Sequence, residues 1–293
     1  MTASTAGKTE TGVRMTLRTD DACDLDTDHL LEVFGGQRRR LIEVLREFGP
    51  HDWAAPTRCA EWSAHDVVRH LCDVTPLIAG QTRDRVVDPA AGFDPRVTPR
   101  QWLTDSAGES PDATLRRLAA TTEEGLGLAR EQLASGRGFN VSMPVGSADW
   151  TVLALHILWD SWVHERDVLL GVGASHEADD SATGYAVAYG LFIAIAVASR
   201  FGDRICGELT LSGDGGGTFA FDNRDGTTLS VIRMAVTGPP AAEVADALAG
   251  RMPVDAVLND MPLTTRTALA RLAGFFNTPV RQGGTSGKSR ESK

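Results

Sequence analysis

The sequence predicts an α+β protein: a helical bundle of four or five helices, followed by a small α+β domain. Apolar residues recur at helical spacing through the first two-thirds of the chain. After Gly202 the pattern changes to strand-like alternation, broken by glycine-rich turns. With 293 residues, the chain is long enough for two domains, and we expect their boundary near residues 203–206.

The expected bundle helices can be justified in order along the chain. The second begins at Ser63, where Asp66 three residues later completes a capping box. A loop with three prolines precedes the third, and Pro111 takes the first-turn position that helices tolerate. The five expected helices cover residues 28–48, 63–80, 111–135, 149–170 and 182–200.

The second domain is expected to combine three short strands with two helices. The strands fall at residues 208–212, 218–221 and 228–234, and the helices at 240–248 and 263–276. The run Gly213–Gly217 lacks the lysine of a phosphate-binding loop and fits a hairpin turn. We therefore expect a bundle domain at 21–203, an α+β domain at 204–280, and disordered tails at 1–20 and 281–293, which are polar and aperiodic.

Composition narrows the classes of function. A net charge of −10 argues against nucleic acid as a partner, and the basic run Arg38–Arg40 fits a solvated helix face. All three lysines lie in the tails, which excludes a Schiff-base mechanism in the folded region. Four widely spaced cysteines, without a signal peptide, favour the reduced cytoplasm. No apolar run reaches the length of a membrane span, about 18 residues, so we expect no membrane partner. The expected partner is a small-molecule substrate, and the expected assembly is a monomer or small homo-oligomer.

Three side chains predict a metal site. Asp160 and His164 are four residues apart, so both project from one face of the fourth helix. His70 lies in the middle of the second helix among apolar residues. Two imidazoles and a carboxylate from two helices would make a three-ligand site that leaves coordination positions open for chemistry.

Spacing alone leaves alternatives open. His156 and Asp167 continue the stripe of Asp160 and His164 along an otherwise apolar helix, so any three of these four polar residues could bind. Burying such groups unpaired is costly, and a hydrogen-bonded network without metal would also satisfy them. Asp66, one turn before His70, could orient that imidazole in addition to capping its helix.

The run from Pro56 to Leu71 (PTRCAEWSAHDVVRHL) resembles the N-terminal signature of the mycothiol-dependent maleylpyruvate isomerase family. That family belongs to the DinB-like four-helix metalloproteins. Its second signature, Glu-x-x-x-His followed closely by Asp, is matched from Asp160 to Asp167 (DSWVHERD), and residues 209–221 and 245–251 resemble its sterol-carrier-like C-terminal domain. The resemblance covers about residues 25–280.

The resemblance implies zinc ligated by His70, Asp160 and His164, and we expect Asp66 and Asp167 to lie behind these ligands. Asp160 replaces the family's usual Glu and shortens the reach by about 1.5 Å, so His156 is the alternative ligand. We expect an isomerase or transferase in which zinc stabilises the thiolate of mycothiol or another small thiol. Arg251 is a candidate for holding a substrate carboxylate. A thiol-independent metalloenzyme and a non-catalytic small-molecule-binding protein are the alternatives.

Overall fold

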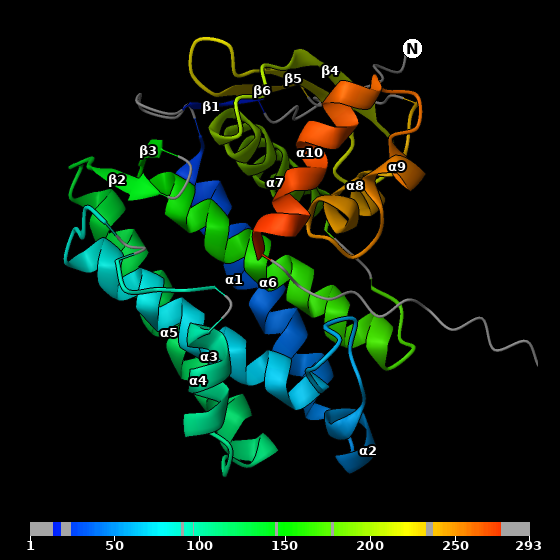
Figure 1. Ribbon diagram of the computed structural model, residues 1–293. Coiled ribbons are helices and arrows are strands. Elements are labelled where there is room, and N and C mark those ends of the chain that lie inside the picture. The colour runs from blue at the N-terminus through cyan, green and yellow to red at the C-terminus, as the bar shows by residue number, and fades with distance from the viewer. Residues whose placement is uncertain are drawn as a thin grey trace, which may run out of the picture.

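The computed structural model describes residues 14–18, 25–88, 91–95, 97–143, 146–176, 179–232 and 237–276. Helices and small antiparallel sheets both contribute, which confirms the α+β class. In Figure 1 the bundle helices lie below and the sheet with the C-terminal helices lies above, and α6 runs diagonally between the two parts. The predicted likeness of these parts to DinB-like and sterol-carrier folds stays a prediction.

Four helices form the bundle, and each begins within about two residues of its expected position. Ser63 caps the second of them, and its backbone N–H donates to the Asp66 carboxylate in the predicted capping box. Within the bundle α3 packs against α5 and α6, and α1 packs against the same two helices. The four are α1 (Thr27–Arg46), α3 (Ala64–Arg83), α5 (Pro111–Ala134) and α6 (Thr151–Gly171).

Short elements that the periodicity did not predict fill the connections between these helices. They are too short to show an apolar repeat, and both short helices have a proline in the first turn. The β2–β3 hairpin leads directly into α6 and sets where that helix begins. The added elements are α2 (Pro50–Ala54), α4 (Thr98–Asp105), β2 (Asn140–Met143) and β3 (Gly146–Asp149).

The three predicted C-terminal strands form an antiparallel sheet. They are β4 (Cys206–Leu211), β5 (Gly217–Asp222) and β6 (Thr228–Ile232). The glycine-rich run between β4 and β5 is a hairpin turn, as predicted. Gly215 has a φ of 77°, and a Cβ there would lie 2.5 Å from the backbone nitrogen of Gly184, so the turn needs glycine to pack on the neighbouring helix.

A fourth strand comes from the N-terminus and corrects one prediction. Residues Arg14–Arg18 form β1, which pairs antiparallel with β6 from Arg14↔Ile232 to Arg18↔Thr228. The strand order is therefore β1-β6-β5-β4, and Leu17 is fully buried. The prediction of a disordered tail at 1–20 is wrong for these five residues, because β6 supplies the ladder partners that their local sequence does not reveal. The rest of that tail and residues 281–293 lie outside the described residues.

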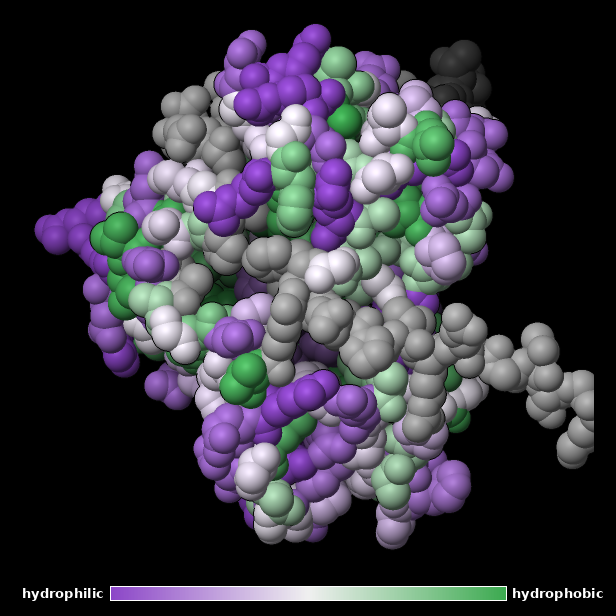
Figure 2. All heavy atoms as spheres, viewed as in Figure 1, coloured by the Kyte–Doolittle hydropathy of each residue, from purple (hydrophilic) through white to green (hydrophobic). Residues whose placement is uncertain are grey.

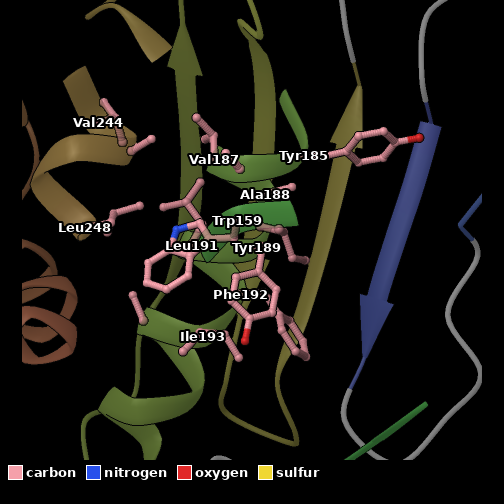
Figure 3. Packing of buried hydrophobic residues seen from close by; sticks show 14 of the residues in the cluster. Trp159, Tyr185, Val187, Ala188, Tyr189, Leu191, Phe192, Ile193, Val244 and Leu248 are labelled. Atoms are coloured by element: carbon pink, nitrogen blue, oxygen red, sulfur yellow. The ribbon is translucent and has the colours of Figure 1, made fainter. Parts of the chain in front are cut away.

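Helix α7 (Asp180–Arg200) ties the bundle to the C-terminal part. It packs against α6 and also against β5, β6, α8 (Ala241–Leu248) and α10 (Leu263–Phe276), while α9 (Val254–Val257) packs beside these last two. Figure 3 shows its apolar side chains meeting those of α8. A single hydrophobic cluster thus runs through both parts of the chain, across the expected boundary at 203–206.

Helix α7 also passes a length and composition test for a membrane span, yet 94% of its most apolar 18-residue window is buried inside the protein. This burial fits the predicted core helix. On the face shown in Figure 2, hydrophobic residues of the described part are dispersed among hydrophilic ones.

Candidate metal centre

The structure brings His70, Asp160 and His164 together, from α3 and α6. The Oδ1 atom of Asp160 lies 3.7 Å from Nε2 of His70 and 3.6 Å from Nε2 of His164. One ligand atom from each residue falls within 4.8 Å of the other two. Both imidazoles are buried, and α6 presents Asp160 and His164 from adjacent turns of one face, as the spacing predicted.

The three side chains fit a divalent metal ion. Ligands held at about 2.0–2.2 Å around tetrahedral zinc stand about 3.3–3.6 Å from one another, close to the two measured separations. In the described part of the chain, the buried Oδ2 of Asp160 and Nδ1 of His70 have no hydrogen-bond partner. A buried carboxylate left in this state is costly unless an ion compensates it, and two imidazoles with one carboxylate are a donor set that zinc accepts.

Electrostatics favour the charged forms at this centre. Burial opposes ionisation of Asp160, but the neighbouring imidazoles of His164 and His70 outweigh it and hold the pKa of this carboxyl well below its usual range. Burial likewise opposes the charge of His164, yet Asp160 and Asp167 raise its pKa to about 10. Without metal, the centre therefore holds a proton on His164 at neutral pH, which a metal ion would displace.

Asp167 lies directly behind His164. The Nδ1–H of His164 donates to Oδ2 of Asp167 over 3.0 Å, which leaves Nε2 facing Asp160. Asp167 is fully buried, and its pKa lies far below the usual carboxyl value, because Arg251 and His164 outweigh the effect of burial. A carboxylate in this place fixes the ring orientation and increases the basicity of a ligating imidazole.

Two arginines hold Asp167 in turn. Arg251 donates from Nε and Nη2 over 2.8 and 2.7 Å, and Arg58 donates from Nε over 3.0 Å. The remaining nitrogen of Arg251, Nη1, donates to the carbonyl of Ala249. The sequence-based assignment of Arg251 to a substrate carboxylate is therefore corrected, because this guanidinium binds a carboxylate of the protein itself.

Asp66 does not take the predicted second role. One of its carboxylate oxygens accepts from the backbone N–H and hydroxyl of Ser63, and the other pairs with Arg69 at 2.5 Å. It therefore caps α3 without orienting His70, whose Nδ1 has no partner among the described residues.

His156 stays outside the ligand group. Its Nδ1 lies 2.8 Å from the hydroxyl oxygen of Tyr189 on α7, so this ring nitrogen already has a partner in the protein. In the described ranges, the groups close enough to hold a metal are His70/Asp160/His164 and a second group of Cys59, His164 and Asp167.

Cys59 is the member of this region that sequence reasoning missed. Its thiol donates to Oδ2 of Asp167 over 3.1 Å, accepts from Nη2 of Arg251 at 3.3 Å, and lies 3.8 Å from Nδ1 of His164. A cation is unfavourable here because Arg58 and Arg251 already neutralise Asp167. The signal that could have found Cys59 is its place inside the Pro56–Leu71 signature.

Arg38 corrects the expectation of a solvated basic face. Its side chain is fully buried, Nη2 donates to Thr75 over 3.3 Å, and the other two guanidinium nitrogens have no partner among the described residues. Burial lowers its pKa to about 10, while Asp160 opposes that shift. Arg38 therefore adds a buried positive charge near the centre, which favours anionic ligands there.

Comparison with known proteins identifies the bundle. Residues 34–169 match the family model of the mycothiol maleylpyruvate isomerase N-terminal domain. The matched segment runs from α1 to the end of α6 and contains all three candidate ligands. No curated protein and no solved structure matches the chain. The match confirms, at the level of the family, the resemblance predicted from the two signatures.

Proposed function

We propose that this chain, which carries a domain of the mycothiol maleylpyruvate isomerase N-terminal family over residues 34–169, is a zinc-dependent enzyme. Its cosubstrate would be mycothiol or another small thiol, and its reaction an isomerisation or thiol transfer on an electrophilic small molecule. The observation that carries the proposal is the convergence of His70, Asp160 and His164 inside the matched domain.

In this proposal each residue has a defined task. His70, Asp160 and His164 would hold the metal, and Asp167 would fix the ring of His164 through its Nδ1. When bound, zinc supplies a positive charge that keeps a thiol in its reactive, deprotonated form near neutral pH. Three protein ligands leave room for that sulfur.

An external nucleophile is favoured by what the chain itself offers. The region between its terminal tails contains no lysine, so it has no side-chain amine for covalent chemistry. Cys59 is buried and contacts Asp167 and Arg251. The family match supplies the choice of mycothiol, and maleylpyruvate is one substrate of that chemical class.

Metal content tests the first half of the proposal. The purified protein should carry about one zinc per chain, and His70→Ala or His164→Ala should lose it while keeping helical content by circular dichroism. His156→Ala is the matched control, because it removes an imidazole from the same helix face outside the ligand group. Full zinc occupancy in both ligand variants would refute the assignment.

Thiol binding tests the second half. Mycothiol titrated into the zinc-loaded protein should release or absorb measurable heat, and the signal should vanish in His70→Ala. Absence of binding at millimolar thiol, with zinc present, would support thiol-independent metal chemistry. Absence of metal from the wild-type protein would support a non-catalytic binding role.

A further inference from the structure

His156, which is half-buried, and Tyr189, which is buried, form a hydrogen-bonded pair one helical turn from the metal centre. The Nδ1 atom of His156 lies 2.8 Å from the phenol oxygen of Tyr189, and the rings are 5.4 Å apart. Tyr189 is 2% exposed and packs in the apolar cluster of α7, where Figure 3 shows its ring between Trp159 and Phe192. The pair therefore joins the ligand-bearing helix α6 to the core helix α7.

The direction of this hydrogen bond fixes the tautomer of His156. Burial, with Asp160 nearby, raises the pKa of Tyr189 far above neutral, so the phenol keeps its proton. That buried proton needs an acceptor, and the only hydrogen-bond partner of the hydroxyl within the described residues is Nδ1 of His156. Tyr189 therefore donates to Nδ1, which puts the proton of the neutral imidazole on Nε2.

The second nitrogen is available. Among the described residues, the hydrogen bond found for the His156 ring is the one at Nδ1, and the residue is partly exposed, so Nε2 is left for a partner outside the protein. Burial lowers the pKa of His156 and outweighs the opposing influence of Asp160, so the ring is neutral at pH 7. His156 precedes Asp160 by one turn on the same helix face, about 6 Å along the axis, and Asp160 and His70 are near enough to influence its pKa.

We propose that the Nε2–H of His156 is a hydrogen-bond donor to a substrate oxygen beside the metal centre, and that Tyr189 is the positioning residue that keeps the proton on Nε2. The ligand class is a carbonyl or carboxylate compound whose oxygen gains negative charge in the reaction. A neutral imidazole suits this task, since it donates a hydrogen bond without forming an ion pair with the substrate.

This inference deepens the proposed function and rests on it. A thiolate added to a double bond next to a carbonyl places negative charge on the carbonyl oxygen. A donor on the wall next to the metal, and not a ligand of it, would stabilise that charge. His156 is therefore assigned to the substrate, and the ligand set is left to the other three residues.

The tautomer can be measured directly in the full chain. Nitrogen-15 NMR of histidine-labelled protein should show His156 protonated on Nε2, identified by loss of its signals in His156→Gln. In Tyr189→Phe the phenol donor is gone, and a substantial population of the Nδ1–H form should appear. A wild-type ring protonated on Nδ1, or a tautomer that Tyr189→Phe leaves unchanged, would overturn the proposal.

Ligand contact is tested with isosteric thiols on the cobalt-substituted protein. Thioglycolate and 3-mercaptopropionate carry a carboxylate where ethanethiol and propanethiol carry a methyl group, and the sulfur-to-cobalt absorption band reports the binding of each. His156→Leu should weaken the carboxylate thiols about tenfold or more, as expected for a lost hydrogen bond to a charged group, and leave the alkyl thiols unchanged. His156→Gln keeps an N–H donor and should recover part of the loss.

The outcomes distinguish a failure of the His156 assignment from a failure of the proposed thiol chemistry. If alkyl thiols fail to bind the cobalt protein, the proposed thiol chemistry fails, whatever His156 does. If alkyl thiols bind but His156→Leu weakens neither carboxylate thiol relative to its alkyl isostere, the assignment of His156 is overturned and the proposed function stands. Equal losses for both classes of thiol would mean that His156 supports the metal, which would also overturn it.

Discussion

Replacing Asp167 with asparagine should have two effects that can be measured separately. One is a loss of stability where the two parts of the chain pack together, and the other is a loss of metal affinity at His164. Asp167 is fully buried and accepts hydrogen bonds from His164, Arg251, Arg58 and Cys59 at 2.7–3.1 Å. The amide keeps the volume but removes the charge, so it leaves Arg251, itself buried, without its counter-ion. Breaking a buried ion pair from one side costs about 3–5 kcal/mol.

The same substitution should weaken metal binding. Loss of the carboxylate behind a ligating imidazole lowers metal affinity about 10–100-fold, since the ring loses both its orientation and part of its basicity. That range corresponds to about 1.4–2.8 kcal/mol. Competition with a chromophoric chelator would give the zinc affinity, and urea unfolding with excess chelator would give the stability of the metal-free protein.

Asp246→Asn is the matched control. Asp246 is also a buried carboxylate held by two arginines, Arg58 and Arg166, and no hydrogen bond joins it to His164 among the described residues. It shares Arg58 with Asp167, so Asp246→Asn can reach the metal centre only through that arginine. It should therefore destabilise the protein comparably but lower zinc affinity clearly less than Asp167→Asn does. Equal zinc affinity in Asp167→Asn and wild type, or an equal loss in the control, would refute the chain of support from Arg251 through Asp167 to His164.

Three further results are expected from the geometry. Burial opposes the charge of Asp246 but its arginine partners outweigh it and lower its pKa, so its stabilising contribution is complete above about pH 4 and is lost as pH falls toward the lower folded-state value. The free energy of unfolding in urea should therefore decrease less steeply between pH 5 and pH 2 in Asp246→Asn than in wild type. Gly171→Ala should destabilise by about 1–3 kcal/mol in thermal unfolding, because its Cβ would lie 2.8 Å from the carbonyl oxygen of Pro56, whereas Gly127→Ala meets nothing within 4 Å and should stabilise by about 0.5–1 kcal/mol. Ser63→Ala should cost about 0.5–2 kcal/mol in urea unfolding through loss of the α3 cap, and no loss would contradict the observed capping box.

The local part of the site was predictable because helical spacing is a local property. Asp160 and His164 share a face by virtue of being four residues apart, and Ser63 with Asp66 signalled the start of α3. Spacing could not rank His156 against Asp160, since Asp160 belongs to the group through its distances to His70 and His164, and His70 comes from another helix. The choice among four polar residues on one stripe depended on tertiary contacts.

The support around Asp167 was beyond sequence reasoning for the same reason. Arg251 carried the right charge for a carboxylate, and only the packing of the C-terminal part against the bundle shows that this carboxylate belongs to Asp167, 84 residues earlier. Arg38 was misassigned because a basic run on an amphipathic helix usually faces water, whereas here α3 and α6 enclose its first member. The sequence reveals the charge of a side chain, but tertiary packing decides whether that side chain is buried.

The pairing of β1 with β6 gives the chain an unusual dependence on its own beginning. These strands are joined in register although more than 200 residues separate them, so the sheet can close only after the chain has been synthesised past β6. The composition of the residues before α1 gives no sign that a fragment lacking them would fold less well. Such a fragment would nevertheless take Leu17 out of the core and turn β6 into an open edge, the kind of strand that recruits another molecule and drives aggregation.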